Sequence, residues 1–124
     1  MLKIEEGVIY ITRGDDAVID AQLNMQDGAT YEVKAGDIVA LTVRKLPSAE
    51  SPIVLSAASV PGSTRIIINA DDTKEAMPGK YSADIQLKTA DGKRYTVWPS
   101  LEGNERYTVR NLENFVIMPE VTMD

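Results

Sequence analysis

The sequence contains no cysteine and no histidine among its 124 residues. Without cysteine, the chain can form neither a disulfide nor a thiolate nucleophile. The sequence therefore does not indicate whether its compartment is oxidising or reducing. Without histidine, it lacks the commonest general base and the commonest metal ligand, which excludes Ser-His triads and most zinc sites. We therefore expect no enzyme activity, no cofactor and no bound metal.

Positive charge and long apolar segments are also scarce. The chain has 13 basic and 19 acidic residues, a formal net charge of −6. An acidic surface is repelled by nucleic acid and by anionic lipid, so neither is an expected partner. No segment approaches the roughly 20 apolar residues that span a bilayer. The N-terminus, which carries Glu5 and Glu6, is not typical of a signal peptide, so we expect synthesis in the cytoplasm.

Apolar residues nevertheless make up 44% of the chain, as is usual for a folded protein. The length predicts one domain over residues 1–124. Apolar and polar residues alternate with period two in residues 17–25, 37–45 and 80–88, and turn signals separate these segments from further short apolar runs at 8–12, 53–60, 64–70, 93–98 and 115–118. This pattern predicts an all-β, immunoglobulin-like β-sandwich of about seven to nine antiparallel strands.

Two connections can be interpreted in more detail. One short helix is predicted near residues 72–77, because Asp72 followed by Glu75 fits a capping box and Pro78 comes directly after. Residues 46–52 are the most linker-like segment. They are too short to separate two domains, so we interpret them as a loop between strands.

The turn at Asp91 and Gly92 allows two strand registers. A two-residue loop would pair Leu87 with Thr96 and turn Tyr95 toward solvent. A three-residue loop over residues 90–92 keeps the apolar side chains on the core face and pairs the strands as Thr89–Lys93, Leu87–Tyr95 and Ile85–Val97. Because a slip of one residue reverses a whole face, we predict the three-residue loop, with Gly92 left-handed and Tyr95 in the core.

Two acidic pairs are the candidates for acid–base or metal chemistry: Asp15-Asp16 and Asp71-Asp72. Adjacent strand residues point to opposite faces, so neither pair forms a ready acid–base couple. We interpret the first as a turn and the second as a helix cap. Calcium binding is the alternative, since loop carboxylates suit Ca²⁺, although the spacing is not that of an EF-hand. An enzyme would need two carboxylates at a working separation in a pocket, and no pair indicates this.

The tripeptide Arg13-Gly14-Asp15 is the sequence that integrins bind. It lies where the first strand must turn into the next, and glycine and aspartate are common turn residues. We therefore interpret it as a turn rather than an adhesion motif.

A candidate interaction surface follows the last predicted hairpin. Trp98 ends a strand and precedes residues 99–111, the most polar stretch of the chain. Long loops on rigid β frameworks often carry function, and tryptophan and tyrosine often anchor protein contacts. The predicted surface comprises Trp98, Leu101, Arg106, Tyr107 and Arg110. The alternative is a sugar-binding platform of exposed rings, drawn from Trp98, Tyr95, Tyr107 and Tyr10.

Motifs in a fixed order extend over residues 8–118. They are Ile11-Thr12-Arg13-Gly14-Asp15, Val43-Arg44-Lys45, Asp71-Asp72-Thr73, Met77-Pro78-Gly79-Lys80-Tyr81, Asp84-Ile85-Gln86-Leu87, Asp91-Gly92, Tyr95-Thr96-Val97 and Phe115-Val116-Ile117. This order resembles the N-terminal domain of tailed-phage baseplate upper proteins, found in phages and prophages of Gram-positive bacteria.

The resemblance implies an immunoglobulin-like domain without catalytic residues. It also implies a virion component that docks on other tail and baseplate proteins near the tail tip, as a homo-oligomer in the assembly. A cell-surface module of similar fold that binds carbohydrate or protein is the alternative function.

Overall fold

The computed structural model describes residues 1–24, 29–99 and 113–120. Within these residues lie one short helix, α1 (Ala70–Thr73), and nine strands. The strands are β1 (Leu2–Glu5), β2 (Val8–Thr12), β3 (Ala17–Asp20), β4 (Ile38–Arg44), β5 (Ile53–Ala58), β6 (Arg65–Ile68), β7 (Gly79–Lys88), β8 (Arg94–Trp98) and β9 (Phe115–Met118). As predicted, residues 46–52 connect two strands, β4 and β5.

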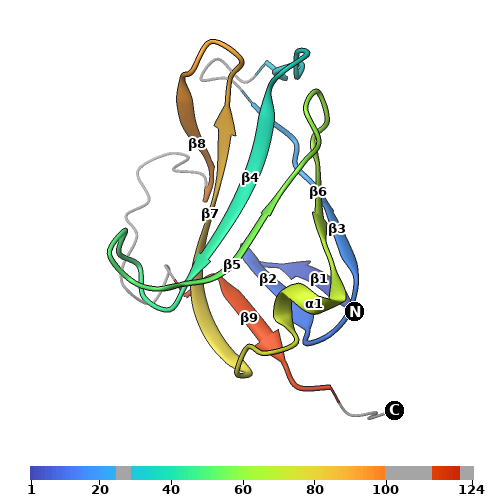
Figure 1. Ribbon diagram of the computed structural model, residues 1–124, viewed down its shortest axis with the longest axis vertical. Coiled ribbons are helices and arrows are strands. Elements are labelled where there is room, and N and C mark those ends of the chain that lie inside the picture. The colour runs from blue at the N-terminus through green and yellow to red at the C-terminus, as the bar shows by residue number, and fades with distance from the viewer. Residues whose placement is uncertain (25–28, 100–112, 121–124) are drawn as a thin grey trace.

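The larger sheet has seven strands and is organised around β7, the longest of them (Figure 1). One edge of β7 pairs with β4, which in turn pairs with β5. The other edge pairs first with β9 and then, further along, with β8. Beyond β9 follow β2 and β1, so β1 and β5 are the end strands of this sheet.

The prediction of antiparallel strands throughout is wrong for one pair. Strands β2 and β9 run parallel, with Ile9 opposite Phe115 and Ile11 opposite Ile117. These two strands come from opposite ends of the chain, so no hairpin fixes their relative direction. All four side chains are buried, and the parallel pair joins the two ends of the chain through the core.

A second, two-stranded sheet pairs β3 with β6, seen at the right of Figure 1. Its inward side chains, Ile19, Ile66 and Ile68, are buried with those of the large sheet in one hydrophobic cluster. Val18 and Ile67 lie opposite each other in the register, and both are exposed. The two sheets therefore share one core, and the small sheet leaves its outer face to solvent.

The period-two alternation predicts the buried faces of the main strands correctly. The buried side chains are Tyr81, Ala83, Ile85 and Leu87 on β7, and Val39, Leu41 and Val43 on β4. Ser82 is an exception on β7, since it is buried although the pattern assigns it to the wet face.

The helix lies earlier than predicted. It spans Ala70–Thr73 with Asn69 as its N-cap, so Asp72 is the third helical residue rather than the cap. The Asp72 carboxylate accepts a hydrogen bond from the Asn69 N–H at 2.7 Å, and the Asp16 carboxylate accepts one from the Ala70 N–H at 2.6 Å. The predicted helix start was wrong because a sequence pattern considers only nearby residues as partners for the first N–H groups of a helix. Here the Ala70 N–H is accepted by Asp16, which lies 54 residues away in sequence.

Candidate interaction surface

The hairpin of β7 and β8 is closed by the three-residue loop that the sequence predicts. The Thr89 N–H donates to the Lys93 carbonyl at 2.9 Å, and the Gly92 N–H donates to the Thr89 carbonyl at 3.0 Å. Gly92 has a φ of 92°, the left-handed conformation that glycine adopts without strain. Leu87 lies opposite Tyr95, which confirms the predicted register near the loop.

The register changes further along the hairpin. Ile85 lies opposite Trp98, not opposite Val97 as predicted. An irregularity between Ile85 and Gln86 in the pairing inserts one extra residue on β8. A β-bulge of this kind shifts all later side chains by one position, and it places Trp98 on the same face as Tyr95.

Tyr95 is 50% exposed, so the prediction that it belongs to the core is wrong. Among the described residues, strand β8 pairs only with β7, and β6 of the small sheet contacts β4 and β5. The face of β8 that carries Tyr95 therefore extends beyond the cover of the second sheet. Lys93 and Arg94 are exposed next to it in an acidic protein.

We call Lys93, Arg94, Tyr95 and Trp98 the hairpin edge. It combines two aromatic side chains and two cations with the outer backbone edge of β8, which pairs with no other strand among the described residues. Aromatic and arginine side chains are enriched at protein interfaces, and a free strand edge can accept an extended partner. The arrangement is suited to binding another protein.

A buried carboxylate holds the loop of this hairpin in place. Asp37 is 2% exposed, and it accepts hydrogen bonds from the Tyr31 hydroxyl at 2.7 Å, the Lys34 N–H at 3.0 Å and the Ala90 N–H at 3.0 Å. The bond from the Lys34 backbone, followed by that from Tyr31, keeps the pKa of Asp37 below its usual range. The hydrogen bond between Tyr31 and Asp37 also raises the pKa of the Tyr31 hydroxyl. Residues 31–37 are thereby fastened to the hairpin loop.

Of the five residues predicted for the interaction surface, only Trp98 can be placed. It is the last residue of β8, is partly buried, and packs against the hydrophobic cluster. Leu101, Arg106, Tyr107 and Arg110 lie outside the described residues. Lys93 and Arg94 were not among the residues predicted for this surface. Two adjacent basic residues beside a turn are unusual in an acidic chain, and this pattern could have indicated that they belong to an interaction surface.

The four rings proposed for a sugar platform divide into separate places. Tyr95 and Trp98 share a face of β8, whereas Tyr10 lies on β2 beneath the Lys3 ammonium, 5.8 Å from the ring centroid. Tyr107 lies outside the described residues. Only two of the four rings can therefore act together among the residues that the structure describes.

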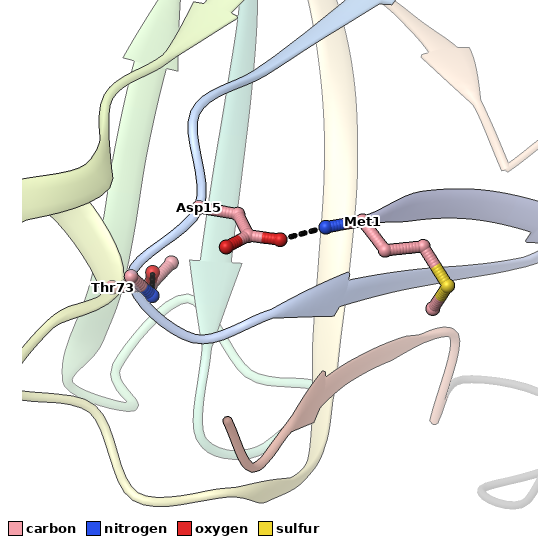
Figure 2. Close-up of polar contacts among 4 residues, drawn as sticks. Met1, Asp15 and Thr73 are labelled. Carbon is pink, nitrogen blue, oxygen red and sulfur yellow. Dashed lines mark hydrogen bonds and ion pairs between the residues drawn. The ribbon is translucent and has the colours of Figure 1, made fainter. Parts of the chain in front are cut away.

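The Arg13-Gly14-Asp15 turn makes contacts within the molecule (Figure 2). The Asp15 carboxylate pairs with the α-ammonium of Met1, and the Gly14 N–H donates to the buried Thr73 hydroxyl at 2.8 Å. Arg13 lies 3.6 Å from the Glu120 carboxylate. These contacts attach the turn to helix α1 and to the segment after β9, in keeping with its interpretation as a structural turn.

Over residues 1–24, 29–99 and 113–120, no group of three or more acidic side chains is placed to hold a metal ion. The same residues contain no helix with the length and hydropathy needed to cross a membrane. No protein family, curated protein or solved structure matches the chain.

Proposed function

We propose that this chain is a non-catalytic structural module of a phage or prophage tail, associated with the baseplate and engaged in protein–protein assembly. Its fold, in this proposal, is an immunoglobulin-like β-sandwich. The observation that carries the assembly role is the hairpin edge, where a half-exposed Tyr95 stands beside Arg94 on β8, whose outer edge pairs with no strand among the described residues.

Three features of the topology support the finer assignment of the fold. Strands β4, β7 and β9 pair as strands C, F and G do in immunoglobulin domains, and β3 pairs with β6 as B does with E. The Tyr81 hydroxyl donates to the Met77 carbonyl four residues upstream. This contact has the form of the tyrosine corner, which lies at the start of strand F in such domains.

The assignment to a phage tail depends on the resemblance to baseplate upper proteins. The motifs that carry most of it are residues 77–81 and 84–87, which lie at the corner before β7 and on β7 itself. Both motifs therefore belong to the framework of the fold. The proposed partner-binding role rests on the hairpin edge and not on these motifs.

One observation favours a second candidate, a cell-surface module that binds carbohydrate. Tyr95 and Trp98 share a face of β8, and aromatic rings on one face can stack on a sugar ring. The chain has a single tryptophan, so its fluorescence reports on this face alone. A saturable change on titration with cell-wall polysaccharide fragments would favour the sugar-binding candidate, and no change would favour assembly.

The phage-tail proposal is tested by locating the protein. Gold-labelled antibodies against this chain are applied to tail particles from the phage or lysogen that encodes it and viewed by electron microscopy. We expect label at one end of the tail. Tail particles without label, from cultures that contain the protein, would overturn the proposal.

A further inference from the structure

The outer edge of strand β1 is the free edge of the large sheet on the side opposite β5. The Thr12 N–H donates to the Met1 carbonyl at 2.9 Å, and the register continues as Lys3 opposite Tyr10. Backbone hydrogen bonds alternate in direction along an antiparallel strand, so the N–H and C=O groups of Leu2 and Ile4 point away from β2. Within the described residues, no strand pairs with them.

An apolar side chain lies uncovered at this edge. Ile4 is opposite the buried Ile9, and therefore on the core face of the sheet, yet it is 56% exposed. Leu2 is on the same face and packs partly against the hydrophobic cluster. A strand added beside β1 would bury part of this exposed side chain.

The opposite face of β1 carries two charges of opposite sign. The Lys3 ammonium lies 2.6 Å from the Glu5 carboxylate, and both side chains are exposed. If a second copy of β1 pairs antiparallel about Ile4, Lys3 of each copy lies opposite Glu5 of the other, and the two Ile4 side chains meet. Opposite charges in directly opposed positions stabilise an antiparallel pair. The edge is therefore complementary to itself in hydrogen bonding, charge and apolar contact.

The edge of β8, in contrast to that of β1, is not complementary to itself. Lys93 and Arg94 are adjacent and have the same sign, so two copies of that edge repel each other. We propose that β1 is a dimerisation strand, through which two copies of the chain join their large sheets across a two-fold axis. This inference is independent of the proposed function, and it leaves the hairpin edge free for another partner.

The absence of cysteine allows a direct test. Ile4→Cys places one thiol at the proposed axis, where opposed residues lie within the distance that a disulfide spans. The matched control is Ile53→Cys on the other end strand, since Ile53 is 55% exposed and Ile4 is 56% exposed. At about 0.15 M salt, which screens the net negative charge, we expect the Ile4→Cys chain to form disulfide-linked dimers about tenfold faster than the control.

Charge reversal separates pairing at β1 from random collision. Lys3→Glu in the Ile4→Cys background opposes carboxylates across the axis, and we expect it to abolish the rate advantage over the control. Adding Glu5→Lys exchanges the two charges and restores the opposed pairs, so the advantage should return. Equal rates for the Ile4→Cys and Ile53→Cys chains, or no recovery on charge exchange, would overturn the dimer. Either result leaves the antibody labelling of tails unaffected, so the two proposals fail separately.

Discussion

The Asn114 side chain is hydrogen-bonded to both backbone polar groups of Ala83. The Ala83 N–H donates to Asn114 Oδ1 at 2.8 Å, and Asn114 Nδ2 donates to the Ala83 carbonyl at 3.0 Å. Along this edge of β7, pairing with β9 ends at Tyr81 and pairing with β8 begins at Ile85. The buried amide of Asn114 therefore satisfies the backbone in the gap between two successive partner strands.

Asn114→Ala should be among the most destabilising substitutions in the chain. It leaves a buried N–H and a buried C=O without partners, and each such group costs about 1–3 kcal/mol. We expect the free energy of unfolding, measured by urea denaturation, to fall by about 3 kcal/mol. Asn24→Ala, at an exposed position, is the control and should change it little. A loss below about 1 kcal/mol would show that water or rearrangement replaces the amide.

Asp37 should make the stability of the protein sensitive to acid. Its folded-state pKa is lowered, first by the Lys34 N–H and then by the Tyr31 hydroxyl. A carboxyl with a lowered folded pKa stabilises the fold above its unfolded pKa of about 4, and this stabilisation disappears as pH falls through the folded pKa. We expect Tm to fall steeply below about pH 4 and less steeply in Asp37→Asn, which begins from a lower Tm at neutral pH.

Tyr31→Phe provides the matched comparison for the acid dependence. It removes one of the three hydrogen bonds to Asp37 and leaves those from Lys34 and Ala90. Between neutral and acidic pH, the decrease in the Tm of Tyr31→Phe should be smaller than that of the wild type and larger than that of Asp37→Asn. Parallel Tm curves for all three proteins would contradict the assigned role of Asp37.

The sequence predicted those parts of the fold that depend on local periodicity. Alternation identified the buried faces of β4 and β7, and the need to keep Leu87 on one face selected the correct hairpin loop. It could not predict the exposure of Tyr95, because that depends on how far the second sheet extends over β8. The contact of Asn114 with Ala83 was equally hidden, since 31 residues separate the two in sequence.

The helix cap and the candidate surface show the same limit. Nothing near Ala70 in sequence indicates that Asp16 will accept its N–H. A bulge on β8 moved Trp98 to the face of Tyr95, and bulges have no reliable sequence signal in the absence of glycine. Four of the five predicted surface residues fall outside the described residues, and the predicted interaction surface stays untested.

Thr73 should be required for its hydroxyl rather than for its shape. The side chain is fully buried, and its hydroxyl accepts the Gly14 N–H at 2.8 Å (Figure 2). Thr73→Val keeps the volume but leaves that N–H unsatisfied, so we expect a loss of about 1–2 kcal/mol in the free energy of unfolding. Thr73→Ser retains the acceptor and should lose less. A larger loss in the serine variant would indicate that methyl packing dominates.

Gly36 should tolerate no side chain while Ala90 is present. Its φ is +91°, and a Cβ built on it would lie 2.9 Å from the Cβ of Ala90. We expect Gly36→Ala to destabilise the protein by about 2 kcal/mol or more, from backbone strain and steric overlap together. Gly7→Ala measures the backbone part alone, since Gly7 has φ +75° and no neighbour within 4 Å. The extra destabilisation of Gly36→Ala over Gly7→Ala measures the overlap with Ala90. Adding Ala90→Gly to Gly36→Ala should recover that part of the free energy of unfolding.

The hairpin edge should determine assembly without contributing to folding. Arg94→Glu combined with Tyr95→Ala changes two exposed side chains at the free edge of β8, so Tm should remain within a few degrees of the wild type. We expect light scattering over a concentration series to detect a closed oligomer larger than a dimer for the wild type, in which the hairpin edge of one copy contacts a different surface of the next, and at most a dimer for the variant.

Ile67→Ala is the matched control for the hairpin variant, because Ile67 is 45% exposed and Tyr95 is 50% exposed. It removes a comparable apolar surface from the outer face of the second sheet and should leave the oligomer intact. A dimer that persists in the hairpin variant fits pairing through β1, which this substitution does not touch. If the wild type and the hairpin variant give the same mass at every concentration, the hairpin edge is not an assembly surface, and the role proposed for Tyr95 and Arg94 is wrong.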